Sequence, residues 1–263
     1  MNWALINDPA YDYAADTRGY TQGVAAEWVE PAWTVRAGSF AMPRVANGID
    51  LEPHFGRSRG DQVEFEYRNS FIGRKPGGVL RLLAYRNLAA MGDYREAMAN
   101  ALETSTTPDI TTTRKNARSK VGFGLNLEQP IADNGDTGVF ARIGWDDGKT
   151  ESFAYTEADD HLCVGGQVSG KHWKLPQDHM GVALVSDGLS APHRDYLAAG
   201  GAGFILGDGK LNYGRENILE TYYQRQLTPL LSLALDYQAI VNPGYNQSRG
   251  PVSVFSARMH MEF

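Results

Sequence analysis

Charged and aromatic side chains recur at alternate positions of short segments and carry the clearest potential for chemistry. The set comprises Arg36, Arg81, Arg142, Glu27, Glu66, Glu128, Asp146, Tyr85 and Phe140. Alternation places such residues on one face of a strand, so they would line a common polar wall. Both signs of charge are present, so the residues do not form a purely anionic or a purely cationic ring. The alternative is that these charges pair with one another and stabilise the wall.

Other patterns that resemble reactive sites lack the required spacing. The glycine-rich strings at 201–203 and 207–210 match neither the dinucleotide nor the phosphate-loop pattern. The six histidines show no zinc-ligand spacing, and the acidic stretch at 146–160 lacks the regular spacing of a calcium loop. Ser253 and His260 fall on opposite faces of one strand and cannot form a catalytic dyad. No catalytic residue, metal site or cofactor is predicted.

The elements that must position the polar wall are strands with two unlike faces. In the last segment, Phe255, Ala257 and Met259 alternate with Ser256 and Arg258. The same period of two predicts about twelve strands, at approximately 1–7, 20–30, 32–42, 63–67, 78–88, 121–127, 139–145, 160–171, 179–187, 216–227, 231–239 and 255–263. A single domain, 1–263, contains them all.

The connections between these strands alternate between short and long. The long ones lie at about 8–19, 43–59, 89–116, 147–159, 188–215 and 242–251, and one of them contains a predicted helix at 93–103. Aromatic residues lie beside the short turns, namely Trp28, Trp33, Phe71, Trp173 and Phe263. Long loops at one end and an aromatic girdle at the other are typical of an antiparallel up-and-down transmembrane β-barrel. The fold class expected is therefore all-β.

Composition limits the remaining possibilities. The 263 residues carry a formal net charge of −6, which argues against general nucleic-acid binding. A single cysteine rules out an intramolecular disulfide. No apolar run approaches the roughly 20 residues of a membrane helix, and the segment after Met1 is not a secretory signal peptide. These observations leave strands as the means of crossing a membrane.

Several strings are similar to a known family. They include Asp16–Thr21, Gly122–Gln129 and Phe140–Trp145, and the most specific part is C-terminal, with Asn242–Asn246 and Arg249–Phe255 before the final Phe263. Together they resemble the carbohydrate-selective outer-membrane porins (the OprB family) from the first residues to the last. The terminal Phe with alternating apolar residues before it also resembles an outer-membrane assembly signal.

The resemblance implies a 16-stranded barrel in the outer membrane of Gram-negative bacteria through which sugars and ions diffuse. Because about twelve strands are counted here, roughly the first four family strands and the export signal are expected to lie outside this sequence. Carbohydrates would be the transported solutes, outer-membrane lipid would surround the barrel, and a homotrimer is allowed. Arginine and carboxylate groups would replace water around sugar hydroxyls, and Phe40, Tyr85, Phe140 or Tyr222 would stack on a pyranose. Arg36, Arg81 and Arg142 are the predicted constriction.

Two other classes of function remain as alternatives. An outer-membrane barrel hydrolase would need a nucleophile and a base together near the rim of the barrel. A soluble β-rich sugar-binding module would bury the apolar face of each strand in a core and would stay in solution without detergent.

Overall fold

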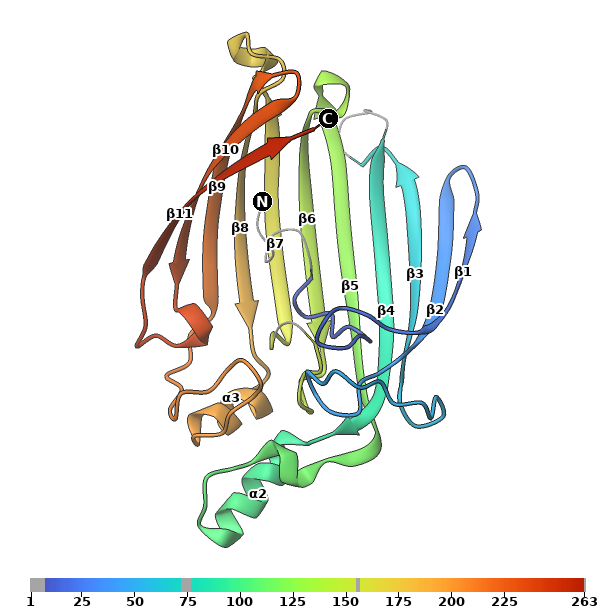
Figure 1. Ribbon diagram of the computed structural model, residues 1–263, viewed down its shortest axis with the longest axis vertical. Coiled ribbons are helices and arrows are strands. Elements are labelled where there is room, and N and C mark those ends of the chain that lie inside the picture. Colours follow the sequence, from blue (N-terminus) through green and yellow to red (C-terminus); the bar gives the residue numbers. More distant parts are fainter. Residues whose placement is uncertain (1–7, 72–76, 155–156, 263) are drawn as a thin grey trace.

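The chain folds into one antiparallel sheet in which every strand pairs with its neighbours in sequence. The computed structural model describes residues 8–71, 77–154 and 157–262, and within them the sheet has eleven strands in the order β1 to β11 (Figure 1). The strands are β1 (Gly23–Val29), β2 (Trp33–Ala41), β3 (Arg59–Asn69), β4 (Gly78–Met91), β5 (Lys115–Ala132), β6 (Thr137–Asp146), β7 (Asp160–Ser169), β8 (His179–Gly188), β9 (Glu216–Thr228), β10 (Leu231–Val241) and β11 (Val252–Met261). This order confirms the up-and-down topology. The strand expected at 1–7 lies outside the described residues.

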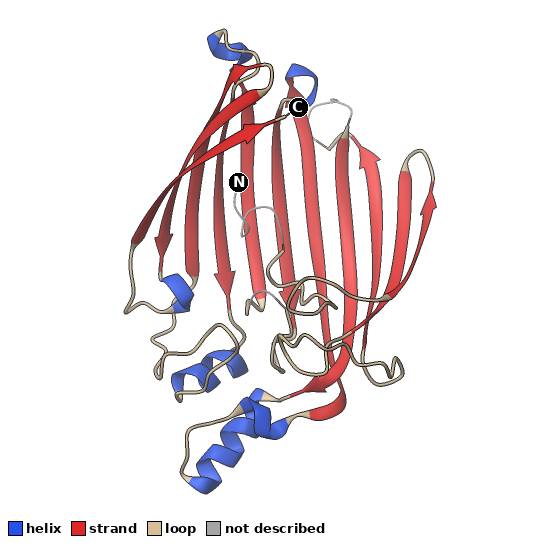
Figure 2. Cartoon of the chain, viewed as in Figure 1, coloured by secondary structure: helices blue, strands red, loops and turns tan. Residues whose placement is uncertain are grey.

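Short and long connections alternate as expected. Among the described residues, the short turns lie at one end of the sheet, and the long loops with α2 (Tyr94–Thr104) and α3 (Ala191–Ala198) lie at the other (Figure 2). The short 3-10 helices are η1 (Ile110–Thr113) and η4 (Pro243–Tyr245) in the long loops, and η2 (Asp133–Gly135) and η3 (Gly170–Trp173) in the short turns. Helix α2 confirms the helix predicted at 93–103, and its N-cap Asp93 accepts a hydrogen bond from the Glu96 amide at 3.0 Å. No helix within the described ranges has the length and apolar character needed to span a bilayer.

The two faces of the sheet differ in the way that the alternation predicts. The face that bears Arg36, Arg81 and Arg142 is called the inner face below. On the opposite, outer face, Leu184 is 55% exposed, and Val164 and Phe123 are 43% and 48% exposed. Large exposed apolar side chains along many strands leave a surface suited to lipid rather than to water.

The edges of the sheet are free of strand partners among the described residues. β1 pairs only with β2, and β11 pairs only with β10. Since neighbours are antiparallel and eleven is odd, β1 and β11 run in the same direction. They could close a fully antiparallel barrel only through an odd number of further strands.

The long loops pack into a small core of their own. Tyr94 of α2, Tyr196 and Leu197 of α3, and Tyr245 are all buried within one apolar cluster. The His193 ring stacks on Tyr94 with ring centroids 4.4 Å apart. The loops therefore form a fixed cap beyond the strands instead of separate mobile hairpins.

We expect a charge on the outer face to be far more costly than the same charge on the inner face. Leu184 lies at the middle of β8, so Leu184→Lys should reduce the free energy of unfolding in lipid vesicles by about 2–4 kcal/mol. Gln62→Lys on the inner face is the matched control and should cost much less. Urea titration of the vesicle-embedded protein measures both values, and equal losses would contradict the assignment of the faces.

Candidate functional site: the inner wall of the sheet

Register brings the predicted charged residues into adjoining rows. Arg36 of β2 pairs with Glu27 of β1 and with Glu64 of β3. Glu66 pairs with Arg81 of β4, and that row continues through β5 to Arg142 of β6. Directly paired residues have Cβ atoms about 5 Å apart, so opposite charges in a row meet without strain.

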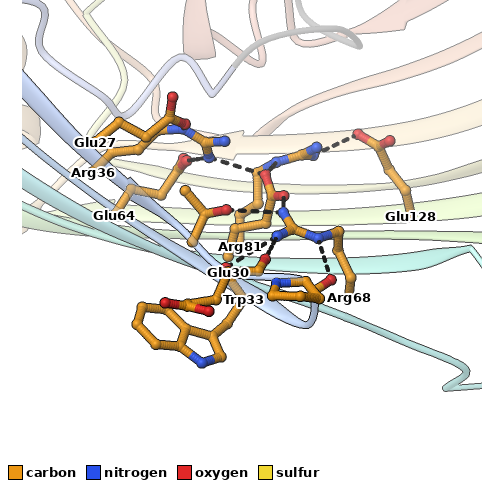
Figure 3. Close-up of polar contacts among 11 residues, drawn as sticks. Glu27, Glu30, Trp33, Arg36, Glu64, Arg68, Arg81 and Glu128 are labelled. Atoms are coloured by element: carbon orange, nitrogen blue, oxygen red, sulfur yellow. Dashed lines mark hydrogen bonds and ion pairs between the residues drawn. The ribbon is translucent and has the colours of Figure 1, made fainter.

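Glu66 connects three arginines in this wall. Figure 3 shows these arginines, Arg36, Arg68 and Arg81, with their polar contacts. Its Oε2 accepts hydrogen bonds from Arg36 Nη1 at 2.9 Å and from Arg81 Nε at 3.0 Å. Its Oε1 accepts one from Arg68 Nη1. The carboxylate is nearly buried, with 8% of the side chain exposed, so the three cations supply the charge compensation that water cannot.

The remaining carboxylates complete the network. Arg36 Nε lies 2.6 Å from Glu27 Oε1, and its Nη1 lies 2.7 Å from Glu64 Oε1. Arg81 Nη1 lies 3.1 Å from Glu128 Oε1. These guanidinium groups are therefore held in fixed positions, and the field that they present to a solute is partly neutralised by their partners.

Arg142 belongs to the same wall but has a different environment. Its guanidinium carbon lies 4.8 Å from the centre of the Phe140 ring, in a cation–π contact along its own strand. Phe140 in turn packs against the buried residues Cys163, Ala183 and Val185. Arg142 thus stands where the charged part of the inner wall meets an apolar part.

The segment that precedes β1 lies across the inner wall. The Tyr85 hydroxyl donates to the carbonyl of Ala10 at 2.9 Å, and Asn87 Nδ2 donates to the carbonyl of Asp12 at 2.6 Å. The Lys120 ammonium lies 3.0 Å from Asp12 Oδ2, with both side chains buried. The expectation that 8–19 is a loop at the end of the barrel is therefore wrong for the part that includes Ala10 and Asp12, which β4 and β5 hold against the wall.

Two glycines make room for the start of this segment. A Cβ on Gly144 would lie 1.9 Å from Asp8 Oδ1, and a Cβ on Gly124 would lie 3.0 Å from Asp8 Oδ2. Gly124 and Gly144 are paired across β5 and β6, one position along each strand's inner face from the row of Arg81 and Arg142. The Asp8 carboxylate therefore occupies a space that any larger inner-face residue would fill.

A cavity of about 590 Å³ separates this segment from the charged wall. Its lining includes Asp8, Tyr11 and Tyr13 from the segment. From the strands it includes Glu27, Arg36, Gln62, Glu64, Arg81, Asn126 and Arg142. The volume is within the range of about 300–1,000 Å³ typical of small-molecule sites, and the lining supplies many hydrogen-bonding groups.

The structure places the nine predicted site residues in different environments. Arg36, Arg81, Arg142 and Glu27 line the cavity. Glu66 and Glu128 are ion-paired with Arg81 and do not line the cavity, and the Phe140 ring contacts the Arg142 guanidinium. Tyr85 and Asp146 are buried, with 5% and 2% exposure, and do not line the cavity. The expectation that Tyr85 stacks on a solute is wrong. The Tyr11 ring packs against it with ring centroids 5.0 Å apart, and its hydroxyl donates a hydrogen bond to the Ala10 carbonyl.

Sequence reasoning missed Asp8, Tyr11 and Tyr13. A usable signal was present in the glycines at inner-face positions of β5 and β6, Gly124 and Gly144, since absent side chains leave room for another segment. Within the described part of the chain, no group of three or more His, Cys, Asp or Glu side chains could hold a metal ion.

Removing the charge of Glu66 should loosen the whole wall. We expect Glu66→Gln to reduce the free energy of unfolding by about 1–2 kcal/mol, because it weakens charged hydrogen bonds to three arginines. The loss stays modest because the arginines are partly exposed and water screens their charges. Glu64→Gln is the matched control, because it removes an equal charge from the same strand, and among the described residues Glu64 forms an ion pair only with Arg36. Denaturant titration compares them, and an equal or larger loss for Glu64→Gln would argue against the central position of Glu66.

The position of residues 8–16 should depend on pH. Burial raises the pKa of Asp8 to about 6, although His161 and Arg142 oppose the shift and Asp187 adds to it. Because an acid with a raised pKa favours the protonated form in the folded state, the segment is most stable below about pH 4 and loses stability as the pH rises through 6.

Hydrogen exchange of the amides in 10–16, corrected for the intrinsic rate, should show greater protection at pH 5 than at pH 8. His161, whose Nδ1 lies 2.6 Å from Asp187 Oδ1, also faces this region, so Asp8→Asn is the necessary control and should abolish most of the pH dependence. Retention of the full dependence in Asp8→Asn would assign it to the His161–Asp187 pair instead.

Comparison with known proteins identifies the family. The model of the OprB family of carbohydrate-selective porins matches residues 1–263. The high-pH structure of Pseudomonas putida OprB is similar with a TM-score of 0.73 and 18% identity, and the match covers 92% of this chain and 59% of that chain. The low-pH structure of the same protein has a TM-score of 0.49 and 16% sequence identity, and the match covers 90% of this chain and 53% of that chain. No curated protein gives a significant match. The chain spans about three-fifths of the length of the high-pH structure, and it belongs to the OprB family of carbohydrate-selective porins, which are outer-membrane proteins.

Proposed function

We propose that this chain forms the wall of an outer-membrane channel through which carbohydrates diffuse. The observation that carries the proposal is the cavity of about 590 Å³ between an apolar-backed sheet and residues 8–16, lined by fixed charges of both signs. Paired arginines and carboxylates offer many donors and acceptors with little net field. Such a lining suits an uncharged solute rich in hydroxyl groups better than it suits an ion.

Arg36, Arg81 and Arg142 are the proposed constriction residues. All three line the cavity, and Arg36 and Arg81 are fixed by the carboxylates around them. A fixed guanidinium group replaces part of the hydration of a passing sugar at little entropic cost. Binding must nevertheless stay weak, because a tightly held solute would not leave the channel.

The two alternative functions have less support. A hydrolase is disfavoured because Ser253 and His260 lie seven positions apart on β11 and so point to opposite faces. A soluble module is disfavoured by the exposed apolar side chains of the outer face, such as Leu184 and Val164. Bilayer lipid is the partner that this face fits, and assembly into a homotrimer through part of it stays a prediction.

Reconstitution tests the proposal directly. Protein inserted into planar bilayers should conduct ions, and added glucose or a glucose oligomer should reduce the current by occupying the cavity. Liposomes that contain the protein should also swell faster than empty liposomes in isotonic sugar. Swelling no faster than that of empty liposomes, for every sugar tried, would contradict transport.

A further inference from the structure

Two tyrosines of residues 8–16 line the cavity. Tyr11 and Tyr13 are both half-buried and line it, with ring centroids 4.6 Å apart and planes tilted by 51°. Tyr11 also packs edge-on against Tyr85, with centroids 5.0 Å apart. The pair is therefore supported from behind by a buried residue of the wall, while part of its surface remains open.

The backbone that carries the two rings is held on both sides. Asp12, between them, accepts hydrogen bonds through Oδ1 from the amides of Phe153 and Ala154, at 2.9 and 3.0 Å. Its other carboxylate oxygen is paired with Lys120. Since Asp12 is anchored to a strand and to a long loop at once, Tyr11 and Tyr13 are preorganised, and binding a solute would cost little ordering entropy.

The rings lie on the loop side of the arginine row. Tyr11 packs on Tyr85, and Tyr85 is four residues along β4 from Arg81. At about 3.3 Å per residue, this separation is roughly 13 Å along the strand. Asp8 lies between the two levels, against Gly124 and Gly144. A solute that entered from the long loops would meet the rings first, and the arginines afterwards.

This arrangement matches the two kinds of surface on a pyranose. The ring of a pyranose has C–H groups on its faces and hydroxyl groups around its rim. Aromatic faces suit the first kind of surface, and charged side chains suit the second. Across the same cavity from the tyrosines, β2 and β3 contribute Arg36, Gln62 and Glu64.

We propose that Tyr11 and Tyr13 form a carbohydrate subsite on the loop side of the arginine row. A pyranose stacks on these rings while its hydroxyls bind the polar side chains of β2 and β3. This subsite rests on the proposed sugar transport and deepens it, because it gives the channel a preference for cyclic sugars over open-chain polyols. The arginine row alone supplies no such preference, since it contacts hydroxyl groups that both kinds of solute carry.

The test measures solute block of the ion current in planar bilayers. Wild-type protein, Tyr13→Leu and Tyr13→Phe are each titrated with glucose and with sorbitol, an acyclic polyol with a similar set of hydroxyls. Tyr13 is chosen because Tyr11 also supports the segment through Tyr85. We expect Tyr13→Leu to raise the half-blocking glucose concentration by roughly threefold to tenfold and to leave sorbitol block unchanged. Tyr13→Phe keeps the ring and should behave like the wild type.

The outcomes separate the subsite from sugar transport itself. If glucose neither blocks nor permeates the wild-type channel, the proposed function fails. If glucose blocks the wild type and Tyr13→Leu equally, transport stands and the subsite is overturned. Equal loss of glucose and sorbitol block would also overturn it, since that result indicates a change of pore width. If Tyr13→Leu fails to form channels, Tyr13→Trp is tested in its place and should strengthen glucose block relative to sorbitol block. If Tyr13→Trp leaves glucose block unchanged, the subsite is overturned.

Discussion

The hydrogen-bond ladder between antiparallel strands is the constraint on which the rest of the molecule depends. In hydrocarbon every backbone amide and carbonyl needs a partner, and neighbouring strands supply it on both sides of β2 to β10 and on one side of β1 and β11. Once the register is fixed, each side chain is assigned to one face. Arg36 then necessarily faces Glu27 and Glu64, and Glu66 faces Arg81. The charged wall follows from pairing, because a shift of one residue would turn these groups toward lipid.

Sequence patterns predicted the parts of the fold that depend on local periodicity. Strands with one polar and one apolar face, such as β3 with Glu64 and Glu66 opposite Val63 and Phe65, were readable directly. In strands β7 to β9 the alternation between polar and apolar residues is weaker than in β3. Around Cys163, Val185 and Ile218 the inner face is also apolar and buried, so both faces carry apolar side chains and the alternation weakens.

The candidate site was only partly predictable, because its second side comes from a segment without periodicity. Residues 8–16 are placed by contacts between residues far apart in the chain, such as the bond from Tyr85 to Ala10. No pattern within the segment encodes these contacts. As a result, the sequence placed Arg36, Arg81 and Arg142 on the inner wall, where they line the cavity, whereas the tyrosines opposite them were missed and Tyr85 was assigned an open position that it does not have.

The shape of the cavity is therefore set by the contacts that hold residues 8–16 in place as much as by the sheet. Strands alone would leave a wide space in front of the arginines, and the buried ion pair between Lys120 and Asp12 is what holds the opposing wall at a fixed depth. A buried pair of this kind adds little net stability, because desolvation offsets the attraction, but it strongly disfavours any position that separates the charges. Since the same carboxylate also holds the amides of Phe153 and Ala154, the segment and that long loop must move together. Loop sequence and cavity width are thus coupled, and selectivity can change through residues that no solute touches.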